Sequence, residues 1–360
     1  MMRPRILETN IAGDSASVVA VSVLARQGRK PMRRFFMSST GAAIGALSLI
    51  VALSAASAGP AGKKVAYFDA GPTHPYVAAL NRAFNARAKE LGLEVTQFDT
   101  PYDAALQAQQ IDDAIARKFD LLAIMAASQS AVVPALNRAK SAGIPVIILN
   151  NGIKEGVEDL YVSEISDDNA KLGKLAAESL VGALQDAGRS QAKVALITGV
   201  LAEGVAKTRL EAFNNLMKAH PNINIVATED AYWDTAKSET IAGQLFARFA
   251  PQGGLDAVVG WADNQTAAII RAAEAAHIPL GTGKGQLIVI GTNCTRDGIQ
   301  AIKEGKEYSS GTQAPVASGQ QTAELVASYF EGKPLPKHVV LDVHTINKGN
   351  VGQWASACIY

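Results

Sequence analysis

The stretch Ile144-Pro-Val-Ile-Ile-Leu-Asn-Asn-Gly152 decides the fold class of this chain. Its apolar residues are mostly β-branched, which predicts a strand buried on both faces, as in a parallel sheet. The strand leads directly into Asn150 and Asn151 and then a glycine. Ligands of open α/β sheets bind beyond the carboxyl ends of the strands, and each amide offers N–H donors and a carbonyl acceptor. The stretch therefore predicts a sheet edge that can grip a hydroxyl-rich molecule, although alone it also fits an Asn-Gly turn.

Strand and helix patterns alternate on the N-terminal side of this stretch and through it. Gly92 and Gly143 stand where helices should end, and Pro134 stands in a first helical turn, where its missing N–H costs little. A β-α-β-α order predicts a parallel sheet with helices on both faces. The predicted strands span 64–69, 93–98, 121–125 and 146–150, and the predicted helices span 75–91, 104–116 and 131–142.

The alternation restarts after the polar stretch Ser163-Glu-Ile-Ser-Asp-Asp-Asn169, which we interpret as a break between two lobes. Two such series over about 300 residues exceed what one core usually holds. After Tyr308 we predict a short strand, a helix over 318–330 and a strand over 339–346, and we interpret the strands as crossings between the lobes. The second series comprises predicted helices at 169–184, 205–219, 235–249 and 265–275, and predicted strands at 193–198, 224–228, 257–260 and 287–291.

The sequence before residue 59 predicts an export signal, preceded by an N-terminal extension over residues 1–31. Met32-Arg-Arg-Phe-Phe-Met37 is positively charged, residues 41–53 are apolar, and Ala56-Ser-Ala58 is a small-residue cleavage site. The alternative is a membrane anchor, for which the apolar segment is short and rich in small residues. The paired arginines leave open whether export uses the general or the twin-arginine route. We therefore expect the mature chain in the periplasm.

The charge of the exported part argues against a nucleic-acid partner. Residues 1–58 hold seven Lys/Arg and two Asp/Glu, which leaves 27 basic and 31 acidic residues and a net charge of −4. Proteins that bind nucleic acid usually carry a basic surplus.

The sequence contains no pattern that predicts a cofactor, a metal or a catalytic centre. Two cysteines, Cys294 and Cys358, and five scattered histidines give no metal-ligand spacing. An oxidising compartment permits a disulfide, but sequence leaves open whether the two Cα atoms lie within about 7 Å. Gly281-Thr-Gly-Lys-Gly285 precedes a strand and lacks the ending of a phosphate loop, so we interpret it as a turn. Nucleophile-elbow and zinc-protease motifs are also absent from the sequence.

The order and spacing of several short segments resemble the periplasmic sugar-binding proteins of ABC importers, the type I group that includes ribose-binding protein. The resemblance covers about residues 63–346, and each segment alone is weakly specific. Sugar-responsive repressors share the fold, but here an export signal stands in place of a DNA-binding head. The segments are Gly71-Pro-Thr-His-Pro-Tyr-Val77, Ile144-Pro-Val-Ile-Ile-Leu-Asn150, Ile165-Ser-Asp-Asp-Asn169, Arg209 to Phe213, Ile288-Val-Ile-Gly291 with Asn293, and Gln313.

The resemblance implies an α/β fold of two similar lobes, each a parallel sheet flanked by helices, joined by three crossing hinge strands. The implied N-terminal lobe comprises residues 63–164 plus 314–342. The implied C-terminal lobe comprises residues 165–313 plus 343–360. A ligand would be clamped in the cleft between them.

The resemblance also implies a set of ligand-binding residues. Tyr76 and Trp233 match stacking aromatics, and Val77 stands where a second aromatic of the first lobe often lies. Ala262 replaces a contacting Asn, with Asp263 beside it. The full implied set is His74, Tyr76, Asn150, Asn151, Arg209, Trp233, Asp263, Asn293 and Gln313.

Departures from the ribose pattern bear on the ligand. Asn150-Asn151 replace Asp-Arg and Asn293 replaces Asp, so the predicted site carries fewer charged groups than a ribose site. It therefore lacks some of the charge-assisted hydrogen bonds to hydroxyl groups, which are roughly twice as strong as neutral ones. Ribose is therefore not the expected ligand, whereas a neutral sugar or polyol still fits the amides and aromatic rings. Arg209, without a carboxylate partner evident in the sequence, leaves a sugar acid or lactone open.

We predict a non-catalytic solute-binding protein of an ABC importer. It would be monomeric and would deliver a neutral sugar or polyol to a permease in the inner membrane. A first alternative is a sensory protein that presents its ligand to a chemoreceptor or histidine kinase. A second is an exported sugar-acting enzyme, for which only Asp263 and His74 are candidate acid and base.

Overall fold

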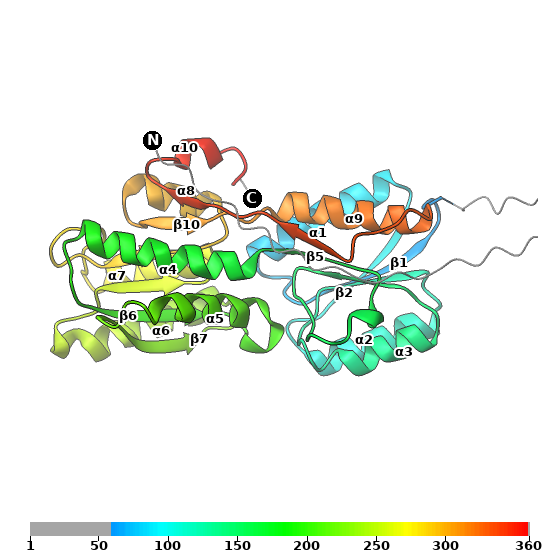
Figure 1. The fold of residues 1–360 in the computed structure, drawn as a ribbon, viewed down its shortest axis with the longest axis horizontal. Helices are drawn as coiled ribbons and strands as arrows, with labels where there is room; N and C mark the ends of the chain where they lie inside the picture. Colours follow the sequence, from blue (N-terminus) through cyan, green and yellow to red (C-terminus); the bar gives the residue numbers. More distant parts are fainter. Residues whose placement is uncertain (1–58, 359–360) are drawn as a thin grey trace, which may run out of the picture. The chain divides into compact units, whose positions relative to one another are not determined.

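The computed structural model describes residues 59–358 of the 360-residue chain (Figure 1). The predicted N-terminal extension, export signal and cleavage site therefore lie outside the described residues. Within residues 59–358, none of the helices combines the length and the apolar character needed to cross a membrane.

The first sheet is built from the N-terminal half of the chain plus one late strand. Val146 to Leu149, the strand within the stretch that decides the fold, is completely buried, as its apolar run predicts. The six strands are β1 (Lys64–Asp69), β2 (Glu94–Asp99), β3 (Leu121–Ile124), β4 (Val146–Leu149), β5 (Ser163–Asp167) and β11 (His338–Leu341). They pair in parallel in the order β11-β5-β4-β3-β1-β2.

Helices cover both faces of this first sheet because alternate strand residues point to opposite sides. Val65 and Tyr67 pack on the side of α1 (Pro75–Glu90) and α9 (Pro315–Phe330). Ala66 and Phe68 pack on the side of the other two helices. Those helices are α2 (Ala104–Ala116) and α3 (Val133–Ser141).

The second sheet also has six strands, and one of its edge strands is antiparallel to its neighbour. Its strands are β6 (Ala192–Thr198), β7 (Ile223–Asp230), β8 (Ala257–Gly260), β9 (Ile288–Ile290), β10 (Ser309–Gly311) and β12 (Thr345–Asn347). The order is β12-β10-β9-β8-β6-β7, and every pair is parallel except β10 with β12.

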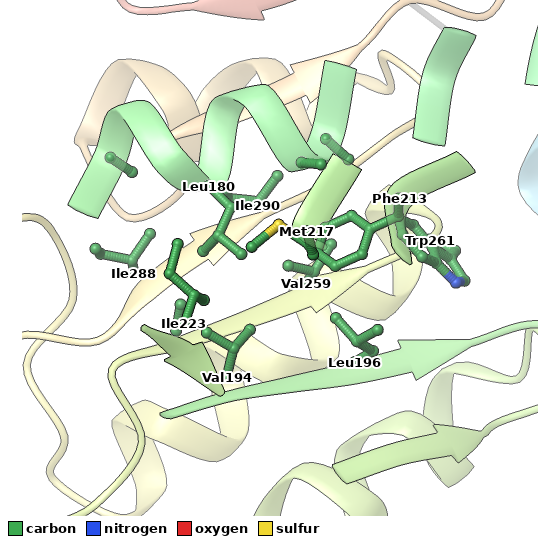
Figure 2. Close-up of a cluster of buried hydrophobic side chains, with 14 of the residues drawn as sticks. Leu180, Val194, Leu196, Phe213, Met217, Ile223, Val259, Trp261, Ile288 and Ile290 are labelled. Atoms are coloured by element: carbon green, nitrogen blue, oxygen red, sulfur yellow. The ribbon is translucent and has the colours of Figure 1, made fainter. Parts of the chain in front are cut away.

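The second sheet also has a core on each face. Figure 2 shows Leu180, Phe213 and Met217 pointing toward Val194 and Val259 of the sheet. These helical residues lie on α4 (Asn169–Asp186) and α5 (Val205–Met217), while α6 (Thr235–Phe249) and α7 (Asp263–Ala275) cover the other face. The remaining short elements are α8 (Arg296–Glu304), α10 (Val351–Trp354), η1 (Glu158–Leu160), η2 (Leu201–Glu203) and η3 (Ala250–Gln252).

The chain passes between the two sheets three times. The crossings follow β5, separate β10 from α9, and separate β11 from β12. The predicted fold class, two parallel-sheet lobes joined by three crossings, is therefore confirmed. The predicted division between residues 164 and 165 falls inside β5, and the lobe boundaries stay a prediction.

Three elements differ from the sequence-based expectation. The strand predicted over 339–346 is divided into β11 of the first sheet and β12 of the second. The polar stretch from Ser163 was expected to be a break, but Ser163–Asp167 forms β5, with Ser163, Ile165 and Asp167 buried. The helix Arg296–Glu304 was not predicted, because its apolar positions are few; Thr295 caps it by accepting a hydrogen bond from Gly298 N. The last two are decided by what packs around them.

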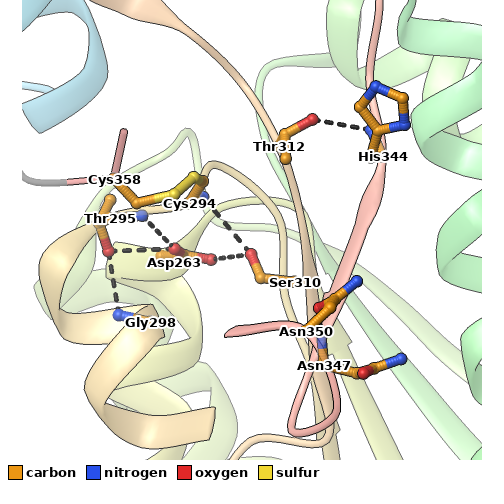
Figure 3. Close-up of a disulfide and its surroundings, with 10 residues drawn as sticks. All are labelled: Asp263, Cys294, Thr295, Gly298, Ser310, Thr312, His344, Asn347, Asn350 and Cys358. Carbon is orange, nitrogen blue, oxygen red and sulfur yellow. Dashed lines mark hydrogen bonds between the residues drawn. A yellow bond between two sulfur atoms is a disulfide. The ribbon is translucent and has the colours of Figure 1, made fainter. Parts of the chain in front are cut away.

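The two cysteines are joined. Cys294 and Cys358 form a disulfide with a Cα–Cα distance of 4.9 Å, within the usual range (Figure 3). The sequence had left this pairing open.

A glycine allows α4 and α5 to approach closely, and its substitution tests this packing. A Cβ on Gly173 would lie 2.1 Å from the backbone oxygen of Arg209. We expect Gly173→Ala to lower the free energy of unfolding by about 1–3 kcal/mol, as overpacking usually does. Gly182→Ala on the same helix is the matched control, because its Cβ would meet only the Tyr308 hydroxyl at 3.6 Å. Denaturant titration of both variants measures this, and equal stability would contradict the prediction.

Candidate functional site

One cavity is lined by residues that follow the carboxyl ends of strands in both sheets. Parallel pairing directs those ends to a common edge of each sheet, where ligands of α/β proteins bind. The lining residues are His74, Tyr76, Val77, Tyr102, Asn150, Asn151, Glu203, Val205, Arg209, Trp233, Asn293 and Gln313. Eight of the nine predicted residues are thus brought together, Asp263 being the exception.

Each lining segment begins where a strand ends. In the first lobe the contributing loops follow β1, β2 and β4, and in the second they follow β6, β7 and β9. Gln313 comes from the crossing after β10. The site therefore depends on many separate segments, none of which forms it alone.

Several of these loops hold non-glycine residues in the left-handed region. The φ angles are 52° at Tyr102, 56° at Asn150, 60° at Trp233 and 111° at Asn293. Such conformations cost free energy and persist where the surroundings enforce them, which is common at functional sites.

Aromatic rings form one part of the wall. A Cβ on Gly199 would lie 1.8 Å from Trp233 Cε2, so the glycine after β6 is what lets the indole lie against the backbone. The His74 ring meets Trp233 edge-on, with centroids 6.0 Å apart, and Tyr76 at 6.5 Å. Apolar ring faces of this kind suit the C–H faces of a sugar or polyol.

A buried carboxylate links the two lobes beside the cavity. Asp167, at the end of β5, accepts hydrogen bonds at Oδ2 from the Tyr76 hydroxyl at 2.8 Å and Gln313 Nε2 at 2.7 Å. Asn293 in turn donates from Nδ2 to the Gln313 side-chain oxygen. Burial raises the pKa of Asp167, while the bonds from Gln313 and Tyr76 and the charge of Arg209 oppose the rise.

Arg209 is held within the second lobe. Its Nε donates to Asn169 Oδ1 at 3.0 Å and its Nη1 donates to the Trp261 carbonyl at 2.7 Å. The guanidinium carbon lies 5.8 Å from the centroid of the Trp233 ring. These contacts fix the cation beside the aromatic wall.

The two adjacent amides have different surroundings. Asn151 is buried, and its Nδ2 donates to the Ala126 carbonyl at 3.0 Å. Asn150 donates from Nδ2 to Asn151 Oδ1 at 2.7 Å. Asn151 therefore anchors the loop, and Asn150, which is less buried, also lines the cavity.

His74 is neutral at physiological pH. Burial lowers its pKa to about 4, and the nearby charge of Arg209 lowers it further while Asn264 opposes this. Its Nδ1 accepts a hydrogen bond from Tyr76 N at 3.2 Å, capping α1. The ring is thus oriented by the helix that carries Tyr76.

Asp263, which the resemblance implied as a ligand-binding residue, does not line the cavity. Its Oδ2 accepts from Thr295 N at 2.6 Å and Thr295 Oγ1 at 3.0 Å, and its Oδ1 accepts from Ser310 Oγ at 2.7 Å. Asp263 begins α7, which turns its carboxylate away from the cavity toward the loop before α8. Its neighbour Ala262 is fully buried.

Four lining residues lie outside the predicted set: Val77, which the resemblance had placed only where a second aromatic often lies, and Tyr102, Glu203 and Val205. The last three each follow a strand, so their positions were the only sequence signal available. Glu203 is buried and accepts a hydrogen bond from Ala206 N at 3.3 Å. Burial raises its pKa to about 8, against hydrogen bonds from Ala206 and Trp233 and the charge of Arg209. It is therefore protonated at neutral pH.

The lobes meet closely around the cavity. Gln129 N, after β3, donates to the Ala202 carbonyl of η2 at 3.0 Å. The cavity volume is about 30 Å³, room for one or two water molecules by the usual measure. A ligand of sugar size therefore needs the lobes to separate or the side chains to shift.

Larger hollows are also present. One, of about 580 Å³, shares Asn150 and Val205 with the cavity. Another, of about 620 Å³, lies in the second lobe at the turn Gly281-Thr282, with Lys306 and Tyr308, and contains none of the predicted site residues. Among residues 59–358, no group of three or more His, Cys, Asp or Glu could hold a metal ion.

The chain that carries this cavity is similar to a known protein family. The periplasmic binding protein domain model matches residues 65–334, most of the chain. The chain belongs to this family. The resemblance that the sequence motifs indicated is confirmed.

Relatives of this periplasmic binding protein include a ribose import binding protein of Haemophilus influenzae. It is 26% identical over 301 residues, which cover 84% of this chain and 97% of the relative. A solved galactofuranose binding protein superimposes with a TM-score of 0.77 at 19% identity, covering 82% of this chain and 98% of that chain. A solute binding protein of Bacillus halodurans with bound myo-inositol gives 0.74 at 20% identity, covering 83% and 99%. The two structures establish similarity of fold.

The protonated state of Glu203 in this periplasmic binding protein predicts a pH dependence of stability. The folded carboxyl has a pKa of about 8, against an ordinary value of 4.5. As pH rises from about 5 to 8 the unfolded chain loses this proton while the folded chain keeps it, so stability falls. Each pKa unit corresponds to about 1.4 kcal/mol, so we expect Glu203→Gln to gain at least about 1–2 kcal/mol over wild type across this range.

Chemical denaturation at several pH values measures the difference. The exposed Glu211, on α5, provides the control variant Glu211→Gln, whose profile should follow wild type. Parallel profiles for wild type and Glu203→Gln would contradict the prediction.

Proposed function

We propose that this chain is the solute-binding protein of an ABC importer and that it captures a neutral sugar or polyol between its lobes. The observation that carries the proposal is the cavity at the strand ends, where Trp233 and Tyr76 stand among the amides Asn150, Asn293 and Gln313. Aromatic faces and amides together suit a ligand with C–H faces and many hydroxyl groups.

The titratable groups that line the cavity suit a neutral ligand. The pKa values of about 8 for Glu203 and about 4 for His74 leave both side chains neutral near pH 7. The guanidinium of Arg209 already donates hydrogen bonds to Asn169 and to the Trp261 carbonyl, so part of its donor capacity is used within the second lobe. The sugar acid that the sequence left open would bind through Arg209, and the ligand screen separates the two classes.

The names of similar proteins support the same ligand class. A relative is named for import of ribose, and two solved structures are named for galactofuranose and for bound myo-inositol. All three molecules are neutral and hydroxyl-rich. Because these three molecules differ, we infer that the side chains lining each protein's own cavity select its ligand.

Closure of the two lobes is the proposed mechanism. Three crossings join the sheets, and cavity residues come from both sides. A ligand that bridges the lobes adds contacts that exist only in the closed form, so binding shifts the population toward that form. The small volume and the Gln129–Ala202 hydrogen bond are features of a closed form.

The proposal also includes the location of the protein, its partner and the absence of catalysis. The protein would be exported to the periplasm and would act as a monomer that presents its closed form to an inner-membrane permease, without catalysis. The enzyme alternative required Asp263 and His74 as a pair, and Asp263 is hydrogen-bonded to Thr295 and Ser310 instead. This disfavours a catalytic role for the cavity.

A ligand screen tests the proposal. Thermal unfolding of the chain from Gly59 would be followed with pentoses, hexoses, polyols and sugar acids. A ligand at about 100 times its Kd should stabilise the fold by roughly 2.7 kcal/mol. We expect stabilisation by one or a few neutral sugars or polyols. Stabilisation by acids alone would overturn the neutral class, and turnover of a bound sugar would overturn the non-catalytic role.

Trp233 should contribute strongly to affinity for whichever molecule the screen finds. We expect Trp233→Ala to weaken binding at least about tenfold, because a stacked aromatic face is lost. Its neighbour Tyr232 is 55% exposed and does not line the cavity, so Tyr232→Ala is the control. Isothermal titration calorimetry gives both dissociation constants, and similar values would contradict the assignment of Trp233.

A further inference from the structure

The C-terminal segment from Val351 to Cys358 lies against a loop that contributes to the ligand cavity. Cys358 is bonded to Cys294, the residue that directly follows cavity-lining Asn293. Both cysteines are buried with Ile299 and Val351 in a small apolar cluster. The disulfide thus joins the end of the described chain to the ligand site.

The loop that carries Asn293 has an unfavourable backbone. Asn293 and Cys294 have φ angles of 111° and 60°, two consecutive non-glycine residues in a region that L side chains rarely adopt. Such conformations are retained where contacts on several sides enforce them. Contacts with neighbouring segments must therefore keep Asn293 and Cys294 in this conformation.

Hydrogen bonds hold the loop from inside the lobe. Asn293 N donates to the Gly311 carbonyl at 3.0 Å. Asp263 accepts from Thr295 on one side and from Ser310 on the other. Figure 3 shows Asp263 between Thr295 and Ser310, directly below the disulfide. Asp263 therefore acts on the cavity indirectly, through the loop.

The C-terminal segment also contacts one crossing between the lobes directly and is linked through it to a second. The Trp354 ring stacks on His344, with centroids 5.3 Å apart and an interplanar angle of 26°. His344, between β11 and β12, donates from its backbone N to Thr312 Oγ1 at 2.7 Å, and Thr312 N donates to the His344 carbonyl at 2.8 Å. Thr312 precedes Gln313, which lines the cavity.

We propose that the segment Val351–Cys358, fastened by the Cys294–Cys358 disulfide, is a positioning element of the ligand site. The disulfide holds Asn293 against the cavity, and Trp354 supports, through His344, the crossing that carries Gln313. The Asn293–Gln313 hydrogen bond then joins the two supported residues. This inference rests on the proposed function only in that the cavity is taken to bind a small molecule.

Two variants test the proposal by different routes. Cys358→Ser removes the bond to Cys294, and Trp354→Ala keeps that bond but removes the ring stacked on His344. We expect affinity for the molecule found in the screen to fall about tenfold in the first and about threefold in the second. Met217→Ala, in the core at the end of α5, is the control because it destabilises the same lobe and Met217 is not in the apolar cluster around the disulfide.

Calorimetry well below the unfolding temperature separates positioning from stability. The expected result is weaker binding in both tail variants and an unchanged dissociation constant in Met217→Ala. Wild-type affinity in both tail variants would overturn the proposal. If Cys358→Ser does not fold, Trp354→Ala alone decides, with the same two outcomes.

Hydrogen exchange tests the proposal without any ligand. We expect the backbone amides of residues 293–295 to exchange at least about tenfold faster in Cys358→Ser than in wild type. In Met217→Ala their rate relative to neighbouring amides should be unchanged. If no molecule stabilises wild type, the proposed function fails, but the exchange rates still confirm or overturn the positioning role.

Discussion

Parallel pairing of the strands is the constraint on which the rest of this structure depends. It places the carboxyl ends of all strands of the first sheet at one edge, and the same holds for the parallel part of the second. Every loop that leaves those edges is free of the regular hydrogen-bond ladder, so its side chains can serve a ligand. The apolar strands and their helices supply rigidity, and chemical diversity is confined to the loops.

Buried polar groups then couple the loops to one another. Asp167 receives hydrogen bonds from Tyr76 of one lobe and from Gln313 of a crossing, and Asn293 extends this chain into the second lobe. Since buried polar groups that lose their hydrogen-bond partners cost free energy, these residues must keep their relative positions when the lobes are closed. Asp263 is buried too, and it accepts hydrogen bonds from Thr295 and Ser310. These bonds organise the loop behind the cavity.

Sequence reasoning predicted some of the cavity-lining residues and missed others, and the two groups differ in the kind of signal that identifies them. Trp233 and Arg209 were predicted because they match family positions, and Asn150 because it directly follows a buried strand, where ligands of α/β sheets bind. Glu203 was missed since its role depends on burial and on contacts with Ala206 and Trp233, which no local pattern records. Asp263 was predicted from its place beside Ala262, but the start of α7 directs its carboxylate elsewhere.

The sequence by itself determined the α/β alternation, the two series of strands and helices, and the family, because periodicity, capping residues and motif order are local properties. It located β1, α2, α6 and β8 correctly for that reason. Only the tertiary structure decided that Ser163–Asp167 is a strand, that Cys294 meets Cys358, and that burial raises the pKa of Glu203. Those outcomes depend on distances and burial among residues far apart in the chain, since pairing, packing and pKa respond to neighbours in space.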